Sequence, residues 1–402
     1  MNFREVLKRR LRILNREAMD RERSIDVFNE AILYLRKFLK PVGMDLLDEQ
    51  YHWNWRTTLC AGCIGTYFTF LLYTIYVNWG QWILVLESCT MTGMACQGIV
   101  KMHNGLKYMG FFNDVHDRLK AMHERNSKHK ENNRVLVFNG LLIQFILRFF
   151  SLVFMFAGLS FFMLSLYQYV RYNELVMAVR IQVPGIDPTN EFGFVVTTIY
   201  HVLLVSTGIA GILAADMAMM MIVLHILGIA DVYKNALKEL DQLLEAEERD
   251  EQMIHRKLLE ICVMHQELIS YEEGLDSTYG TIVFVQVISS VACLVLSLFI
   301  TYMTRNIGIA FFLVAAVFQL FEFCLLGTTL TVKNDHIELA IYDTCWYKLC
   351  TEEQKMMSLV LFRSQNAVEM TIGGVALLNM ETFVEIMKTI YSSFAMMVQV
   401  LE

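Results

Sequence analysis

Six long apolar segments constrain this chain more than any other feature. A helix that crosses a membrane needs roughly 20 mainly apolar residues. Segments of about that length or longer are 57–79, 82–100, 138–170, 194–227, 278–304 and 308–330. Across 402 residues, 55% are hydrophobic and only 19% are charged. The mean hydropathy is +0.41, which is typical of a membrane protein. The sequence therefore predicts an all-α membrane protein, and without internal repeats we expect a single domain over 1–402.

A seventh segment, 380–400, is weaker because it carries a polar stripe. If it is helical, one face combines polar residues at i, i+4, i+7, i+11 and i+18, namely Glu381, Glu385, Lys388, Ser392 and Gln399. A charge near the bilayer centre costs roughly 2.5–3.5 kcal/mol, so this stripe must face protein or water. Two interpretations remain open: the helix lines a shared aqueous pore, or it packs inside a bundle with its charges near the membrane boundary.

Basic residues gather in alternate connections between these segments. The segment before the first span and every second connection after it hold 29 Lys and Arg in total, whereas the remaining connections hold 3. Because basic connections stay in the cytoplasm, the amino terminus is predicted to be cytoplasmic. Seven spans then place the carboxyl terminus outside, which is opposite to a G-protein-coupled receptor. The connections predicted to be cytoplasmic are 101–137, 228–277 and 331–379.

The inner and outer connections differ in character. Leu237, Leu240 and Leu244 recur at helical spacing in the inner connection after the fourth span. The inner connections are therefore predicted to be helical extensions that pack together as a cytoplasmic anchor. The outer segment 171–193 holds two of the three prolines, and we expect it to fold over the mouth of a pocket between spans.

Several classes of function are disfavoured. Cys60 and Cys63 lack neighbouring Cys or His partners, so we interpret them as packing residues; none of the nine cysteines lies in an outer loop, so no structural disulfide is expected. Only His201 and His225 are embedded in spans, too few for a zinc hydrolase. We expect no enzyme activity, catalytic residue, metal or cofactor. The basic residues are explained by topology, so no nucleic acid is expected. G-protein-coupled receptor signatures and transporter-like repeated halves are missing.

Four carboxyl-terminal motifs carry a family resemblance. They are VMHQELISYEEGLDSTYG, FQLFEFCLLGTTLTVKND with Cys324 and Gly327, AIYDTCWYKL, and TIYSSFAMMVQV. Together with the inverted topology, they make the chain resemble an insect odorant receptor over nearly its whole length. Gustatory receptors share the terminal motif, but Ser392-Ser393 here replaces its Thr-Tyr pair. A gustatory receptor is therefore the alternative, ahead of a G-protein-coupled receptor or a transporter.

The resemblance implies a function in olfaction. Members of this family assemble as heterotetrameric, odorant-gated, non-selective cation channels in which a tuning subunit joins a co-receptor. The connection 228–277 is too short for the co-receptor, so this chain resembles a tuning subunit. The partners implied are the co-receptor, a small volatile ligand, membrane lipid and permeating cations. The location implied is the plasma membrane of olfactory sensory neuron dendrites. The seventh helix is expected to line the pore, with Ser392, Met396, Gln399 and Val400 as pore and gate residues.

The resemblance also places an odorant pocket in the outer half of the bundle. It lies between the second, third, fourth and sixth spans. A volatile ligand needs an apolar cavity with few polar groups, although each aromatic side chain there is also explained by core packing. Glu87, Tyr200 and His201 are the polar candidates, and solvated snorkelling is the alternative for Glu87. The candidate ligand-binding residues are Ile83, Leu86, Glu87, Gly158, Phe161, Phe162, Tyr200, His201, Leu204, Phe311, Phe312 and Phe318.

Three further charges lie inside predicted spans: Arg148, Asp216 and Glu322. Isolated charges at this depth are costly, so we expect all three to pair within the bundle. Such pairs either couple the pocket to the pore or only stabilise the bundle. The sequence leaves the identity of the odorant and the subunit ratio open.

Overall fold

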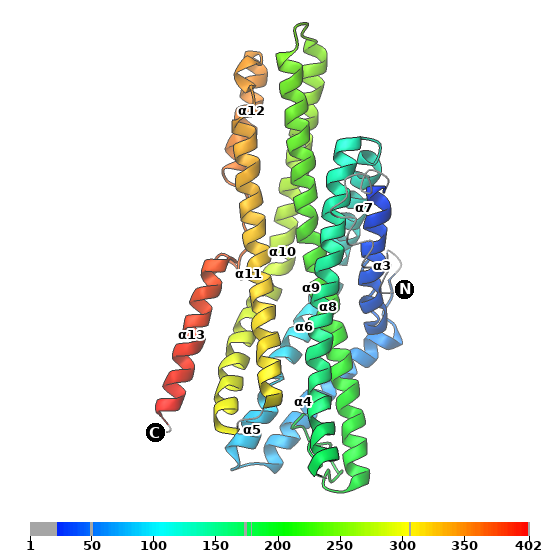
Figure 1. The fold of residues 1–402 in the computed structure, drawn as a ribbon, viewed down its shortest axis with the longest axis vertical. Coiled ribbons are helices and arrows are strands. Elements are labelled where there is room, and N and C mark those ends of the chain that lie inside the picture. The colour runs from blue at the N-terminus through cyan, green and yellow to red at the C-terminus, as the bar shows by residue number, and fades with distance from the viewer. Residues whose placement is uncertain (1–21, 49–50, 173–174, 178, 305–306, 401–402) are drawn as a thin grey trace.

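The computed structural model describes residues 22–48, 51–172, 175–177, 179–304 and 307–400. Within this part of the chain the fold is helical, apart from one isolated β-bridge between Thr371 and Leu377, as the sequence predicts. Figure 1 shows an elongated bundle. Its helices are α3 (Ser24–Val42), α4 (Trp55–Val77), α5 (Trp82–Cys89), α6 (Thr92–Lys107), α7 (Met109–Asn126), α8 (Lys130–Tyr172), α9 (Glu191–Glu245), α10 (Glu251–Thr304), α11 (Ile307–Tyr342), η2 (Trp346–Lys348), α12 (Thr351–Ser364) and α13 (Met380–Gln399).

Six helices in the described ranges have the length and apolar character needed to cross a membrane. They are Trp55–Val77, Trp82–Lys107, Lys130–Arg171, Glu191–Glu245, Glu251–Thr304 and Phe312–Lys348. All six apolar segments of the sequence therefore fall on helices. The second is interrupted, because α5 ends at Cys89 and α6 begins at Thr92. The helix α13 has 20 residues but is not among the six, so the seventh span stays a prediction.

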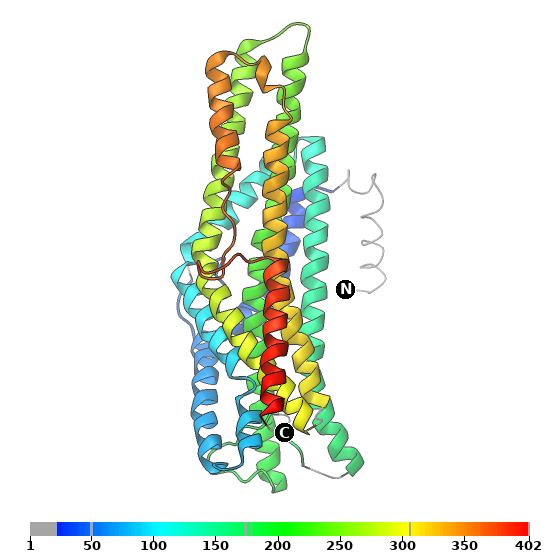
Figure 2. The ribbon, with the colours of Figure 1, turned by 90° about the vertical axis from the view of Figure 1, so that its left-hand side faces the viewer.

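Two helices run far beyond any membrane thickness. α9 has 55 residues and α10 has 54, and at 1.5 Å per residue each is about 80 Å long. In Figures 1 and 2, their shared turn lies at the same end of the molecule as α12. The connections α4–α5 and α8–α9 lie at the opposite end. Two of the basic connections, 228–277 and 331–379, thus extend to the same end of the bundle, and the orientation in the membrane stays a prediction.

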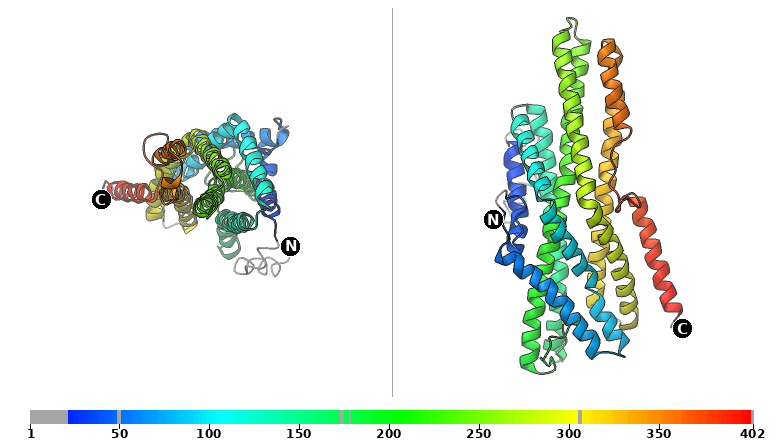
Figure 3. Two further views of the ribbon diagram at one scale, coloured as in Figure 1. Left: turned by 90° about the horizontal axis from the view of Figure 1, so that it is seen from above. Right: turned by 180° about the vertical axis from the view of Figure 1, so that it is seen from behind.

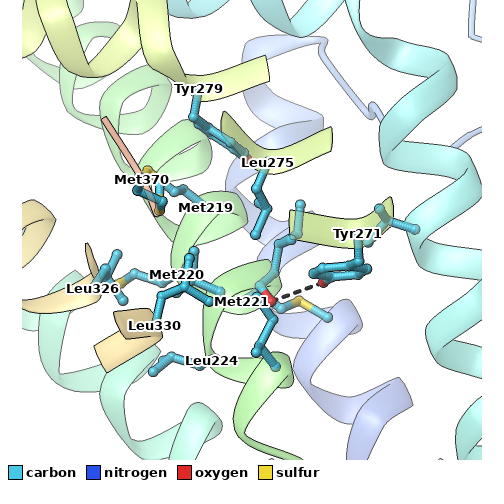
Figure 4. Close-up of a cluster of buried hydrophobic side chains, with 14 of the residues drawn as sticks. Met219, Met220, Met221, Leu224, Tyr271, Leu275, Tyr279, Leu326, Leu330 and Met370 are labelled. Atoms are coloured by element: carbon cyan, nitrogen blue, oxygen red, sulfur yellow. Dashed lines mark hydrogen bonds between the residues drawn. The ribbon is translucent and has the colours of Figure 1, made fainter. Parts of the chain in front are cut away.

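The core of the bundle is built around α9. Met219, Met220 and Met221 are three consecutive residues at most 4% exposed, so all faces of the helix are covered there. Figure 4 shows them between Tyr271 of α10 and Leu330 of α11. The Tyr271 hydroxyl donates to the carbonyl oxygen of Ile222 at 2.9 Å, which satisfies its polar end inside an apolar cluster. Flexible methionine side chains fill the irregular gaps between these helices.

A tight junction between α3 and α4 closes the inner end of the bundle. Gly43 ends α3 with φ of 78°, and a Cβ there would lie 2.5 Å from the side-chain oxygen of Asn54. Asn54 caps α4 and donates to the Gly43 carbonyl oxygen at 2.8 Å. The chain therefore turns sharply after α3, which brings Met44 and Leu46 beneath the central cavity.

Candidate functional site

An apolar cavity of about 160 Å³ lies along the axis of the bundle. Residues of α3, α4, α6, α8, α9, α10 and α11 line it. Its wall includes Leu39, Met44, Leu46, Cys60, Cys63, Ile64, Tyr67, Met91, Met94, Gln97, Lys101, Met102, Phe154, Gly158, Leu204, Val205, Thr207, Ile212, Cys293, Phe312 and Gln319. A cavity with this lining favours a small, mainly apolar ligand, because burial of apolar surface supplies most of the affinity.

Three residues that the sequence analysis proposed for a pocket lie in this wall. Gly158, Leu204 and Phe312 come from α8, α9 and α11, and the structure brings them together. A Cβ at Gly158 would lie 2.1 Å from the Ile209 Cδ1 atom, so any larger residue there would displace the end of the Ile209 side chain. The close approach of α8 and α9 at this glycine shapes the wall. Their role in ligand binding remains a prediction.

Sulfur-bearing residues form much of the wall, and the sequence analysis did not propose them. Cys60 and Cys63 were interpreted as packing residues, and they do lie in the packed interior while also facing the cavity, together with Met91, Met94 and Cys293. One feature of the sequence could have indicated that they share a wall: Cys60 and Cys63 are three residues apart, so they lie on one face of a helix. Polarisable sulfur adapts to ligands of different shape.

The polar candidates Glu87, Tyr200 and His201 lie near the outer end of the cavity but do not line it. Glu87 forms an ion pair with Arg180, with 3.2 Å between Oε2 and Nε, so it does not snorkel into solvent. The ring of His201 contacts the Ile181 carbonyl oxygen at 3.0 Å through Nε2. The Tyr200 hydroxyl lies 3.5 Å from the Thr66 hydroxyl oxygen.

Residues 180–182 form a strap over this end, which we call the outer clasp. Besides the contacts of Arg180 and Ile181, the Gln182 amide donates to the Thr74 hydroxyl oxygen at 2.9 Å. The Ile181 side chain is fully buried in a cluster that includes Tyr67 and Leu204, and both of these line the cavity. Residues 180–182 thus pack against two residues of the cavity wall, and the covering of the pocket mouth by segment 171–193 stays a prediction.

The other candidate residues are placed elsewhere. Ile83 is 44% exposed on α5, and Leu86 and Phe162 are half-buried. Phe318 is half-buried and packs against Phe150, with 5.9 Å between the ring centroids. None of these four lines the cavity. The side chains of Phe161 and Phe311 lie outside the described residues.

A buried charge cluster lies beside the inner part of the cavity. Lys101 Nζ lies 2.6 Å from Asp216 Oδ1, and both side chains are at most 3% exposed. Gln319 donates to the other Asp216 oxygen at 2.7 Å. The prediction that Asp216 pairs within the bundle is confirmed. Its partner corrects another expectation, since Lys101 was assigned to a cytoplasmic connection but lies buried in α6.

The other two charges behave differently. Arg148 has no acidic partner within the described residues; it donates to the Gln144 side-chain oxygen at 3.3 Å and lies 5.7 Å from the centre of the Tyr34 ring. Neither carboxyl oxygen of Glu322 has a hydrogen-bond partner among the described residues. The expectation that Glu322 pairs is therefore wrong, because the single ammonium nearby is already taken by Asp216.

The polar stripe of α13 faces away from the rest of the chain. The helix packs on α10 and α11 through Ile390, which is 2% exposed, and through ring contacts of Phe383 and Phe394. The opposite face carries the stripe and the proposed gate residues, all exposed: Glu381, Glu385, Lys388, Ser392, Met396, Gln399 and Val400. Figures 2 and 3 show α13 standing at the side of the bundle.

Comparison with known proteins decides the family. A family model described as 7tm odorant receptor matches residues 81–391. The chain belongs to the odorant receptor family. This confirms the resemblance carried by the carboxyl-terminal motifs, and the assignment to a receptor family agrees with the prediction that the chain is not an enzyme.

Relatives of the receptor come from several insects. Odorant receptor 83c of Drosophila melanogaster is 25% identical over 389 residues, which are 92% of this chain and 96% of that protein. Odorant receptor 10 of Aedes albopictus is 24% identical over 145 residues, 35% of this chain and 39% of that protein. The structure of the olfactory receptor OR5 from Machilis hrabei in complex with eugenol superposes with a TM-score of 0.72 at 15% identity. That match covers 92% of this receptor and 99% of OR5, which establishes the shared fold.

Proposed function

We propose that this odorant receptor is the odorant-binding subunit of a heteromeric, ligand-gated, non-selective cation channel. The chain would assemble with odorant co-receptor subunits as a heterotetramer in the plasma membrane of olfactory sensory neuron dendrites. A volatile molecule binds in the central cavity, and its binding opens a pore lined by α13. The observation that carries the proposal is the combination of an apolar cavity with an exposed polar stripe on α13.

The cavity supports the ligand-binding half of this proposal. Its wall combines apolar and sulfur-bearing side chains from seven helices, and Ile181 of the outer clasp packs in one cluster with Tyr67 and Leu204 of that wall. The OR5 structure, which contains eugenol, has the same fold. A ligand in this cavity touches helices that also carry α13, since α13 packs on α10 and α11. Binding can therefore change the position of α13 through direct packing.

The stripe on α13 supports the channel half. Charged and amide side chains facing away from the subunit need water or another subunit around them. Met396 is 65% exposed and Val400 is 82% exposed, and both lie on the side of α13 that carries the polar stripe, so they would face the same water-filled pore. A ring of such side chains closes a pore by excluding hydrated ions. Gln399 beside them is suited to hold hydrated cations.

Replacement of Val400 by Lys tests the pore assignment. The receptor is expressed with the co-receptor, and odorant-evoked current is recorded. A ring that contains an ammonium repels cations, so we expect a large loss of cation current or a changed ion selectivity, at normal surface expression. Val375→Lys is the control, because Val375 is 77% exposed in the loop before α13. Unaltered selectivity and conductance in Val400→Lys would rule out a pore role for this position.

A further inference from the structure

We propose that the cavity selects neutral apolar molecules that carry one hydroxyl group, and that Lys101 and Gln97 bind this hydroxyl together. The inference rests on the proposed function, since it takes the cavity to be the odorant site. It names the chemical class of the ligand, alcohols or phenols, from two polar side chains that α6 brings to a mainly apolar wall.

Lys101 supplies hydrogen-bond donors that nothing in the described structure uses. Its ammonium carries three N–H groups. One faces Asp216 at 2.6 Å, and no hydrogen bond to any other described residue is made by Nζ. The Lys101 residue is 5% exposed, so its remaining donors are largely shielded from bulk solvent. A ligand oxygen that accepts from Lys101 would therefore replace an unmade hydrogen bond.

Gln97 supplies the complementary acceptor. Its Nε2 donates to the Ser289 hydroxyl oxygen at 2.8 Å, whereas its Oε1 is buried with no partner among the described residues. Gln97 and Lys101 are four residues apart on α6, so they lie on one face about one helical turn apart. Both residues line the cavity. A hydroxyl group both accepts and donates, so one O–H can satisfy the Lys101 donor and the Gln97 acceptor.

The charges around Lys101 disfavour ionised ligands. Asp216 already balances Lys101, and Glu322 lies close enough to interact electrostatically with both. A carboxylate would bring a further acid group beside these two, and an ammonium has no lone pair with which to accept from Lys101. Ethers and ketones accept from Lys101 but leave the Gln97 oxygen unpartnered. An alkane leaves both groups unpartnered.

A series of molecules with one carbon skeleton tests this selection. The series comprises the alkane, primary alcohol, methyl ether, ketone, amine and carboxylic acid. Two quantities are measured on the receptor assembled with its co-receptor: evoked current, and the thermal stabilisation of the purified complex by each molecule. We expect the alcohol to act at a concentration at least tenfold lower than the ether or ketone. The alkane, amine and acid should be weaker still.

Two variants separate the contributions of the two polar groups. Gln97→Met removes the acceptor and should bring the alcohol to the level of the ether, with the ether unchanged. Lys101→Met combined with Asp216→Asn removes both members of the ion pair, and should abolish the preference for the ether and the ketone over the alkane. Phe312→Ala is the matched cavity control: it should change the preferred chain length but leave the ratio of alcohol to ether unchanged.

The two readouts distinguish failure of this inference from failure of the proposed function. Selective stabilisation by the alcohol without any current would support the hydroxyl site and contradict the channel. Equal stabilisation by the alkane, ether and alcohol would overturn the hydroxyl site whether or not current flows. Absence of stabilisation by every member of the series would overturn it as well. The ligand series on the unmodified chain gives this answer even where a variant fails to reach the surface.

Discussion

The carbonyl oxygen of Leu378 lies where a side chain on Gly327 would have to be. A Cβ at Gly327 would come within 1.8 Å of that oxygen. One residue further along α11, the Thr328 hydroxyl oxygen accepts from the Met380 amide at 2.9 Å. The chain thus enters α13 directly against the backbone of α11, and Asn379 caps α13 by accepting from the Thr382 amide. The position of the proposed pore helix depends on this contact.

Gly327→Ala should disable the channel without unfolding the bundle. The added methyl group cannot pass a backbone oxygen, so the start of α13 must shift, at a cost of about 1–3 kcal/mol. We expect evoked current to fall by at least tenfold while the cavity still binds odorant. The measurement is current together with ligand-induced thermal stabilisation of the purified complex. Gly62→Ala is the control, because nothing lies within 4 Å of its Cβ position; equal effects of both substitutions would contradict the prediction.

Phe312→Ala should widen the range of accepted ligands toward larger molecules. Phe312 is 5% exposed and lines the cavity, and loss of a buried ring typically costs about 3–5 kcal/mol of stability unless a ligand fills the space. Larger odorants should therefore gain potency relative to small ones in a dose–response panel. Phe162→Ala, at a half-buried position outside the cavity wall, provides the comparison. A stronger change of ligand range in Phe162→Ala than in Phe312→Ala would assign the pocket to a different place.

Loosening the outer clasp should speed the exchange of ligand. Arg180 is 39% exposed and Glu87 only 6% exposed in their side chains, so their pair is worth about 1 kcal/mol or less. Arg180→Met should accelerate the decay of current after odorant removal by about twofold to fivefold. Arg180→Met and Glu87→Gln combined should add little to either single substitution, as a double-mutant cycle measures. Fully additive effects would mean that the two residues act independently.

Acid should destabilise the receptor through His123. This residue of α7 is 1% exposed and stacks on Phe28. Burial, and then the neighbouring His225, lower the pKa of His123 from 6.5 to about 3. The folded state therefore keeps His123 neutral, and its contribution is complete above pH 6.5. It is lost as pH falls from 6.5 toward 3, by roughly 1.4 kcal/mol per pH unit.

Thermal unfolding of the purified receptor at pH 7.5 and pH 5.5 measures this effect. His123→Phe keeps an aromatic ring beside Phe28 and removes the titrating group, so the variant should lose less stability between the two pH values. His116→Phe is a control, because His116 also lies beside the Phe28 ring but its side chain is 20% exposed. An identical loss of stability in the unmodified receptor and in His123→Phe would exclude His123 as the cause.

Apolar run length predicted the helices well, because a buried or lipid-facing helix leaves a continuous hydrophobic signature. The break between α5 and α6 was not predictable in this way. No Gly or Pro lies between Cys89 and Thr92, and the reason is tertiary: a Cβ at Gly93 would lie 2.4 Å from the Cys293 sulfur, so α6 is drawn against α10.

The candidate site was only partly accessible from sequence. Gly158, Leu204 and Phe312 were proposed because they lie in the outer half of their predicted spans, and all three line one cavity. Lys101 was not proposed as a cavity residue, because the predicted second span was ended at residue 100, just before this charged side chain. The available signal was Asp216, which needed a positive partner at its own depth. Glu87 and His201 were chosen as polar groups for a ligand, whereas the structure uses both to hold the outer clasp; which partner a polar group finds depends on the path of a loop.

The unbroken length of α9 and α10 has a mechanical consequence. A rod of about 80 Å with no kink-forming proline along it acts as a lever, so tilting one end displaces the other. In the proposed heteromeric assembly, a partner subunit that contacted the far ends of these helices would thereby change the shape of the cavity. The same chain assembled with different partner subunits would then respond to different ligands, although no residue of the cavity had changed.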